Sequence, residues 1–561
     1  MTSTPSPLGR PLTASGSLPG SPLGAEKTRR YDRQLRLWGD HGQTALEAAK
    51  LCLIHAGATG SEVLKSLVLP GVGAFTIVDG QRVAASDVGN NFFLEPGQLK
   101  PIESQSLGQP RGAAVAQYLL ELNNEVRGDS VDETPEHILA HRPDFFKSFT
   151  LVVATDMSEK SLKQLSSLLW QANIPLMVVR AYGFISYIRL QVKEHTIVES
   201  HPDNEFPDLR LDQPFPALIQ FMESQDMKAM DKHEHMHTPY VVILYKYLQK
   251  WKAEHGNQMP INYKEKKQFK ETILEGVLKS PDGLPEDEEN FTEAVNAVNT
   301  TLIPSKVPDE VQAILDDDQC MNLNLKSSDF WFIVRGIRDF LESTGHLPLK
   351  GTIPDMFSDS QRYIQLQLVY RKKADEDAEE VLKYVQIHLE TAGRPAESIS
   401  EAKVKSFCRN AFNLRLIRCG ASIAEEFDGH SPNNQELGQI LEQDPDSPAI
   451  YYVIFRGVDR FYSEHNVLPG VLDDQVEPDI GKLKNCVAKV LADCHLASVN
   501  ISDDNIHEVC RYGGSELHAM ASIIGGCAAQ EVIKLITRQY VPISNLFLYN
   551  CMTSQTITLK V

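Results

Sequence analysis

Apolar and polar residues follow two different periods in the first part of the chain. The short apolar run Leu51–Ala56 predicts a buried strand, and the glycine turn Gly57–Gly60 follows it directly. Apolar positions at helical spacing over Ser61–Leu69 then predict a helix, and Ala74–Val78 predicts a second strand. A strand, a glycine turn, a helix and a strand in this order are typical of the first unit of a doubly wound parallel sheet.

The same alternation continues to about residue 200 and returns near the C-terminus, whereas the spacing between these two stretches is mostly helical. A long helical insertion is therefore expected to interrupt an α/β sheet. The pattern predicts a helix from Tyr31 to near Lys50, helices at Ala113–Leu122, Ser158–Gln171 and Leu517–Thr537, and strands at Phe149–Ala154, Pro175–Arg180, Tyr187–Val198, Asn545–Tyr549 and Thr556–Val561.

These patterns divide the chain into four parts. Residues 1–26 are rich in Ser, Pro, Gly and Thr and predict a disordered tail, with an organelle transit peptide as the alternative. Residues 27–200 form the first part of the α/β domain, residues 201–505 the mainly helical insertion, and residues 506–561 the second part of the α/β domain.

The helical stretch contains one internal repeat. Phe332–Pro348 resembles Val453–Pro469 at a constant offset of 121 residues, which aligns Gly336 with Gly457. Two copies are too few for a solenoid, which needs about three or more. The repeat therefore predicts a duplicated unit of helix packing without chemistry of its own.

Charge and cysteine content narrow the class of protein. The 561 residues include 75 Asp and Glu against 55 Lys and Arg, which gives a net charge of −20. Such a field repels nucleic acid, so no nucleic-acid partner is expected. No run of about 18 apolar residues is present, so no membrane partner is expected either. Nine cysteines without a CxxC pair favour a reducing compartment, the cytoplasm or the nucleus.

The turn Gly57–Gly60 and the acidic residue Asp79 are candidates for nucleotide binding. Backbone N–H groups at a helix N-terminus bind phosphate, and an acidic residue about twenty positions later suits a ribose hydroxyl pair. The turn reads G-A-T-G-S-E, so Thr59 stands where the middle glycine of the full motif would be. A tight turn with Asp79 capping a loop is the structural alternative, and an NAD-dependent oxidoreductase is an alternative function.

Several long segments of the chain, taken together, show a specific resemblance to a known protein family. From about Arg30 to Val561 the chain resembles the activating enzymes of ubiquitin and ubiquitin-like modifiers. The order of the segments and the size of the insertion are most similar to those of the regulatory subunits in heterodimeric activating enzymes for neddylation. The segments are YDRQLRLWGDHGQ, GATGSEVLKSLVLPGVGAFTIVDG, GNNFFL, LKGTIPDM followed by YIQLQLVY, and GGCAAQEVIKLIT.

The resemblance implies a fold and a partner. The fold is a Rossmann-like adenylation fold of the ThiF/MoeB type with a parallel-rich sheet. A large, mainly helical insertion corresponds to the catalytic-cysteine region of the relatives and interrupts this sheet. In this family two adenylation domains pair, and one of them is generally a degenerate partner that supports the active one.

The motifs of active members are damaged here. Phe92 stands where an arginine is expected, and Arg111 replaces a lysine, which changes the geometry offered to a phosphate. Asp156 keeps a carboxylate for Mg²⁺, but Met157 replaces the neighbouring asparagine. Asp156 also suits the N-cap of the helix that follows it. The residues of this degenerate site are Gly57, Gly60, Asp79, Arg111 and Asp156.

Arg33 in the YDRQ segment is the candidate catalytic residue. The resemblance implies that the matching arginine lies near the dimer interface and acts in trans, on the nucleotide bound by the partner subunit. A salt bridge at the interface is the alternative role for Arg33, and Arg36 is expected to be a plain surface or interface charge.

Neither a thioester nucleophile nor a metal site is expected in this chain. Cys408 and Cys419 lie near arginines, but within a helical pattern that is typical of buried structural cysteines. Cys527, between Gly526 and Ala528, is expected to be a small core residue. The histidines His233, His235 and His237 lack a fourth ligand nearby.

The sequence therefore predicts a regulatory subunit that is not an enzyme on its own. It predicts no cofactor of its own, with ATP and Mg²⁺ at the partner subunit. The expected partners are the catalytic subunit, the ubiquitin-like modifier and a conjugating enzyme, and the expected location is the cytoplasm, the nucleus or both. A pure adaptor and a self-sufficient adenylating enzyme are the remaining alternatives.

Overall fold

The chain divides into two compact units. The structure, a computed structural model, describes residues 22–94, 106–203, 205–303 and 305–561. Unit 1 comprises Met1–Lys193, Arg418–Thr537 and Pro542–Val561, and unit 2 comprises Glu194–Ile417 and Arg538–Val541.

This division differs from the predicted one. Residues 418–505 belong to unit 1, because helices α17 (Ile423–Phe427) and α19 (Ile450–His465) pack on α6 (Glu159–Ala172) in the core of the α/β domain. The predicted tail lies outside the described residues as far as residue 21, whereas residues 22–26 already belong to helix α1.

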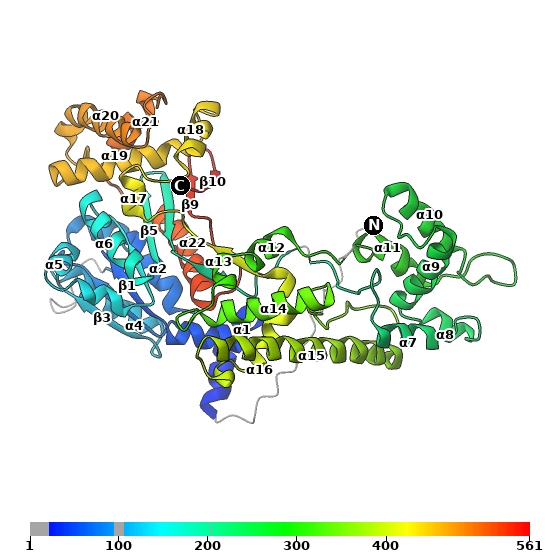
Figure 1. Ribbon diagram of the computed structural model, residues 1–561. Coiled ribbons are helices and arrows are strands. Elements are labelled where there is room, and N and C mark those ends of the chain that lie inside the picture. The colour runs from blue at the N-terminus through cyan, green and yellow to red at the C-terminus, as the bar shows by residue number, and fades with distance from the viewer. Residues whose placement is uncertain (1–21, 95–105, 204, 304) are drawn as a thin grey trace. The chain divides into compact units, whose positions relative to one another are not determined.

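Unit 1 is an α/β domain whose described residues form an eight-stranded sheet with helices packed on it (Figure 1). Its strands are β1 Lys50–Ile54, β2 Ala74–Val78, β3 Arg127–Val131, β4 Leu151–Ala154, β5 Leu176–Tyr182, β6 Ile185–Gln191, β9 Leu546–Asn550 and β10 Gln555–Leu559. The remaining helices are α1 Pro22–Ala48, α2 Ala58–Val68, α3 Ala85–Asn90, α4 Arg111–Leu122, α5 Pro135–His141, η2 Pro143–Ser148, α18 Asn434–Gln443, η5 Asp473–Gln475, α20 Val476–Asp493, α21 Asp503–Tyr512 and α22 His518–Thr537.

The strand order confirms the predicted doubly wound, parallel-rich sheet. The order is β10-β9-β6-β5-β4-β1-β2-β3, with parallel pairing from β3 to β5 and antiparallel pairing from β5 to β10. Strands β4, β5 and β6 are buried along their whole length, which shows that both faces of the sheet are covered. Strands β2 and β3 are added on one side of β1, and β4 and β5 on the other side. The space between β1 and β4 is therefore the topological switch point of the sheet, where ligands bind in folds of this kind.

The single strand predicted at Tyr187–Val198 is wrong. The chain forms β6 in unit 1 and then a short strand, β7 (His195–Ile197), which pairs with β8 (Arg415–Ile417) in a separate sheet of unit 2. The two strands are separated by Val192, Lys193 and Glu194, and the two charged residues interrupt the strand pattern. Strand β3 was not predicted, because its sequence RGDSV is mostly polar.

Helix α22 is a long apolar helix against the sheet. Among the described residues it alone has the length and hydropathy of a membrane span, and 56% of its apolar 18-residue window is buried. It packs on α2, where a Cβ on Gly525 would lie 2.7 Å from the Cβ of Glu62. The prediction that Cys527 is a core residue is wrong, because Cys527 lies on the exposed face of α22 with Ile523 and Gly526.

Unit 2 is mainly helical, as predicted for the insertion. Its longest helix, α15 (Ser360–Thr391), contributes to two separate apolar cores and has α14 and α16 packed against it (Figure 1). The other elements are α7 Pro216–Ser224, α8 Lys232–Met236, α9 Tyr240–Glu254, α10 Tyr263–Leu274, α11 Glu289–Thr301, α12 Asp309–Leu315, α13 Asp318–Met321, α14 Asp329–Thr344, η3 Ala396–Ser398, α16 Glu401–Arg409 and η4 Ala411–Asn413.

The internal repeat is confirmed as a unit of helix packing, with one copy in each unit of the chain. In unit 2, α14 packs on α15, and a Cβ on Gly336 would lie 2.6 Å from Val385 Cγ2. In unit 1, α19 packs on α20, and a Cβ on Gly457 would lie 2.6 Å from Val487 Cγ2. Glycine therefore sets how closely both helix pairs approach.

A buried aspartate fixes the loop after the first helix in both copies. The Leu349 N–H donates to Asp377 Oδ2 at 2.9 Å, and the Gly470 N–H donates to Asp479 Oδ2 at 3.1 Å. The two donors are 121 residues apart, which is the offset of the repeat. Asp377 is buried although it lies within the acidic stretch Asp375–Glu380 of α15.

Candidate functional site

The predicted nucleotide site lies at one edge of the sheet of unit 1. Gly57 follows β1, Asp79 follows β2 and Asp156 follows β4, so all three residues lie at the carboxyl ends of parallel strands. The structure therefore brings the predicted residues to the topological switch point of the sheet.

The N-terminus of α2 is already occupied by a carboxylate of the same chain. The Ala58 N–H donates to Glu516 Oε2 at 2.9 Å, and the Thr59 N–H lies 3.2 Å from Glu516 Oε1. These N–H groups are the donors that a phosphate would use. A Cβ on Gly57 would lie 2.5 Å from Glu516 Oε2, so the glycine is what lets the carboxylate approach.

Glu516 is held in place from the other side of the site. The Asn90 side-chain amide donates to the backbone carbonyl of Glu516 at 3.1 Å. Burial raises the pKa of the Glu516 carboxyl to about 7, and the nearby Asp156 contributes in the same direction. The hydrogen bonds from Thr59 and Ala58 oppose this shift. A carboxyl with a pKa raised to about 7 therefore occupies the position that the sequence predicts for a phosphate.

Asp79 and Arg111 are paired with each other. Asp79 is fully buried, and its Oδ2 accepts from the Ala56 N–H at 2.9 Å and from Arg111 Nε at 2.7 Å. Arg111 also donates to Asp87 Oδ1 at 3.2 Å. Burial alone would lower the pKa of Arg111, but the charges of Asp79 and Asp87 raise it. The predicted ribose acceptor and the predicted phosphate ligand thus neutralise one another.

Asp156 does not cap the helix that follows it, so this prediction is wrong. The N-cap of α6 is Ser158, whose hydroxyl accepts from the Ser161 N–H. Asp156 has a left-handed backbone with φ of 49°. Its Oδ1 lies 3.6 Å from Nε of the buried Arg180, so Asp156 takes part in an ion pair within the site.

Arg180 has a second and closer acidic partner. Its Nη1 pairs with Asp459, a buried residue of α19. Burial raises the pKa of Asp459 to about 6, against the lowering effect of Arg180. Helix α19 therefore supplies an acidic partner for Arg180. The sequence analysis had assigned this helix to the insertion.

The segment GNNFFL departs from the expected motif and contains one buried residue, Asn91, beside one exposed residue, Phe92. Asn91 is buried and its amide donates to Ala56 O at 3.2 Å and to Ser61 Oγ at 3.0 Å. Phe92 is 86% exposed among the described residues, at the position where the sequence resemblance implies an arginine in active members. Asn91 thus stabilises the glycine turn, whereas Phe92 offers no charge to a nucleotide.

Gly60 is required by the fold of the turn. A Cβ at this position would lie 2.4 Å from the backbone carbonyl oxygen of His55 and 3.1 Å from the Leu53 methyl groups. Backbone atoms cannot move aside as a side chain can, so only glycine fits. Gly60 therefore has a packing role that does not depend on a nucleotide.

Arg33 lies on α1 with its side chain 87% exposed. Its one ion pair among the described residues is with Asp32, at 3.4 Å, and Asp32 also contacts Arg36 at 3.2 Å. Among the residues that the structure describes, the Arg33 side chain thus has no contact beyond Asp32 that would explain an arginine here. Its role in trans stays a prediction.

The cysteines with arginines nearby are buried. Burial raises the pKa of the Cys408 thiol to about 12, which disfavours the nucleophilic thiolate. Cys419 is also buried, and its Sγ lies 3.5 Å from Leu190 O. Neither thiol has the exposed, electropositive surroundings of a thioester nucleophile.

The three neighbouring histidines are engaged in other contacts. His235 is buried and its Nδ1 lies 2.7 Å from Glu288 Oε1. The rings of His233 and His237 stack with centroids 4.2 Å apart. No group of three or more metal-ligating side chains occurs in the part of the chain that the structure describes.

The residues of the sheet edge do not fit a bound nucleotide in this arrangement. The α2 N-terminus holds Glu516, Asp79 holds Arg111, and the carboxylate of Asp156 faces Arg180. Each group that would contact phosphate, ribose or Mg²⁺ has a partner from the same chain. Glu516 was missed by the sequence analysis, because 458 residues separate it from the Ala58 N–H that it contacts.

Comparison with known proteins gives the family. The ThiF family model matches residues 31–561. The NEDD8-activating enzyme E1 regulatory subunit of Danio rerio is 49% identical, over 95% of this chain and 98% of that protein. The Xenopus laevis protein of the same name is 48% identical over the same shares, and the Drosophila melanogaster one is 44% identical over 97% and 100%. The chain therefore belongs to the ThiF family and, within it, to the NEDD8-activating enzyme E1 regulatory subunits.

Proposed function

We propose that this chain is the non-catalytic half of a heterodimer in which the other subunit adenylates NEDD8 and carries it as a thioester. The observation that carries the proposal is the Glu516 carboxylate on the N-terminus of α2. Adenylation concentrates negative charge on the triphosphate, and a carboxyl at this position, which takes up the N–H donors and is partly ionised near neutral pH, would oppose it. The chemistry then belongs to the partner, and this chain supports it.

The support includes one side chain that acts across the dimer interface. The guanidinium of Arg33 is exposed and only loosely paired with Asp32. A guanidinium that reaches a nucleotide from a neighbouring subunit stabilises the charge that develops on the phosphates during transfer. Arg33 thus lowers the barrier to adenylation on the partner without binding nucleotide on its own chain.

ATP and Mg²⁺ are accordingly expected at the catalytic subunit. The conjugating enzyme is expected to dock on the assembled heterodimer, because it receives the modifier from the thioester. The nine free thiols of this chain support a location in the cytoplasm or the nucleus, where thiols stay reduced.

The test is the rate of NEDD8 adenylate formation by the catalytic subunit in the presence of saturating Arg33→Ala chain. We expect the rate to fall by about a hundredfold, since removal of one preorganised charge-stabilising donor commonly costs this much. Arg36→Ala is the matched control, because Arg36 lies one turn away on α1 and also pairs with Asp32. The control should change the rate by less than about twofold.

Binding must be measured beside the rate, because the alternative role of Arg33 is an interface salt bridge. A role in catalysis leaves the dissociation constant of the heterodimer nearly unchanged and lowers only the rate at saturation. A weaker heterodimer with a normal rate at saturation would instead assign Arg33 to the interface.

A further inference from the structure

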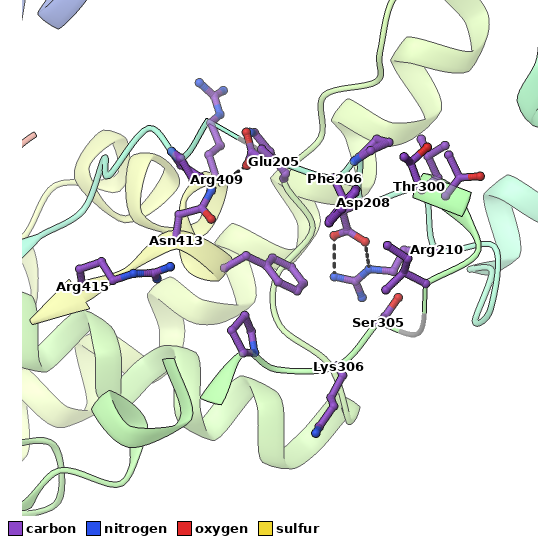
Figure 2. A pocket seen from close by; sticks show the side chains of 18 residues that line it. Glu205, Phe206, Asp208, Arg210, Thr300, Ser305, Lys306, Arg409, Asn413 and Arg415 are labelled. Atoms are coloured by element: carbon purple, nitrogen blue, oxygen red, sulfur yellow. Dashed lines mark hydrogen bonds and ion pairs between the residues drawn. The ribbon is translucent and has the colours of Figure 1, made fainter. Parts of the chain in front are cut away.

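Unit 2 contains a pocket that the proposed function does not use. It has a volume of about 330 Å³ and lies between the segment after β7, the end of α11, the end of α16 and β8 (Figure 2). All of its lining residues belong to unit 2. The volume is at the lower end of the range for sites that bind ligands.

The charge of the pocket is opposite to that of the chain. Its lining includes five cationic side chains, Arg210, Lys306, Lys350, Arg409 and Arg415, against the two acidic side chains Glu205 and Asp208. The whole chain carries a net charge of −20. A local excess of positive charge on such a protein attracts an acidic group at short range, within about 10 Å, where salt does not yet screen it.

The cations differ in how far they are already paired. Arg210 is held by Asp208 at 2.7 and 3.1 Å, and Lys350 pairs with Glu205 at 2.5 Å. By contrast, Lys306 and Arg409 are exposed and have no ion pair or hydrogen bond with the described residues.

Arg415 is intermediate between these two groups. Its only acidic contact among the described residues is at 3.4 Å with Glu310, whose side chain is 68% exposed. Such a pair is weak in water. Three positive charges are thus available to a ligand, from Lys306, Arg409 and Arg415.

Apolar side chains line the same pocket. Phe206 is 56% exposed and Ile303 is 39% exposed, although both are large apolar residues. Phe412 also lines the pocket, with the Arg210 guanidinium 5.9 Å from its ring centroid. Exposed apolar groups rimmed by charge are typical of a surface that binds another protein.

We propose that this pocket docks an acidic segment of a protein partner. Carboxylates of the segment pair with Lys306, Arg409 and Arg415, and an apolar side chain of the segment packs against Phe206 and Ile303. The cations come from separate segments and lie on different sides of the pocket, so they suit carboxylates spread along a peptide (Figure 2). A single phosphate would need these cations to converge on one point.

The test uses the full chain and a fluorescent peptide, Asp-Glu-Phe-Asp-Glu, with Asn-Gln-Phe-Asn-Gln as the uncharged probe. We expect fluorescence anisotropy to show binding of the acidic peptide only, and weaker binding as salt is added. The double variant Lys306→Glu/Arg409→Glu should weaken binding by about tenfold, since two attractive pairs become repulsive. The matched control is Lys264→Glu/Lys267→Glu, which makes the same charge change on exposed lysines of α10.

A second variant tests the apolar part of the proposal. Phe206→Ala should weaken the acidic peptide by about threefold or more, and it should not affect Asp-Glu-Ala-Asp-Glu, which lacks the apolar anchor. Equal binding of the charged and uncharged peptides would overturn the proposal. So would an equal effect of the control variant, or complete displacement of the peptide by millimolar inorganic phosphate, which would make the pocket a site for a small anion.

Discussion

The most informative residue of unit 1 is a carboxylate in the place of a phosphate. Glu516 satisfies two N–H groups at the start of α2 that would otherwise lack a partner. The same position is unfavourable for its charge, because burial and Asp156 both raise the pKa of Glu516. The residue thus completes the fold of the turn at an electrostatic cost that depends on pH.

Replacing Glu516 by glutamine tests this dependence. A pKa raised from 4.5 to about 7 means that the stabilising contribution of Glu516 is complete below the unfolded pKa and is lost as pH rises through 7. The variant carries no titrating group here. Its apparent Tm should therefore rise relative to the wild type as pH increases from about 5 to about 8, by the equivalent of about 2–3 kcal/mol.

Glu436→Gln on the exposed surface of α18 is the control and should leave the difference constant. A pH-independent difference between Glu516→Gln and the wild type would mean that Glu516 does not titrate in the folded chain. The claim that the site holds a carboxyl whose charged form is disfavoured by burial and by Asp156 would then fail.

Sequence reasoning found most residues of this site but not their contacts. Gly57, Asp79, Arg111 and Asp156 follow strands or begin helices, so local patterns predict their common sheet edge. The pairing of Asp79 with Arg111 depends on side-chain geometry. The cap of α6 was assigned to Asp156 because aspartate commonly caps helices, whereas the hydroxyl of Ser158 has the required position at N-cap.

Among the helices and strands, prediction succeeded where a strong period or a glycine marks the element. Strand β2 has the predicted bounds Ala74–Val78, and α22 begins one residue after its predicted start. Failures occurred where the pattern is weak or continues across a boundary. The polar strand β3 has no apolar signal, and β6 and β7 belong to different sheets although their residues are nearly contiguous.

The repeated helix pairs allow a test of close packing. Gly336→Ala places a Cβ 2.6 Å from Val385 Cγ2 and 3.1 Å from the Val381 carbonyl oxygen. The clash outweighs the gain in helix propensity of up to about 1 kcal/mol, so the apparent Tm of unit 2 should fall by about 2–6 °C. Thermal unfolding by differential scanning calorimetry measures this change.

Two further variants show whether the contact itself is responsible. The loss caused by Gly336→Ala should become smaller in a Val385→Ala background, where the nearest atom is removed. Gly481→Ala on α20 meets nothing within 4 Å and should stabilise unit 1 slightly. Equal losses from Gly336→Ala in both backgrounds would contradict the packing role of this glycine.

At the scale of the whole molecule, the chain separates an α/β domain, whose sheet edge holds Glu516, from a helical unit that contains a cationic pocket. The boundary could not be predicted, because residues 418–505 have the same helical period as the insertion and differ only in what they pack against. The cationic pocket could not be predicted from the sequence either. Its basic residues are spread from 210 to 415 along a chain whose net charge is −20.

The central claim is that this chain supports adenylation without performing it. ATP–pyrophosphate exchange that depends on NEDD8 tests it most directly, first with the purified chain alone and then with the catalytic subunit added. We expect no exchange by the chain alone and, for the mixture, exchange above the level of the catalytic subunit by itself. Exchange by the chain alone would contradict the account, because it would require a nucleotide at the sheet edge that Glu516 fills. A mixture no faster than the catalytic subunit by itself would also contradict it, and would leave the chain as a pure adaptor.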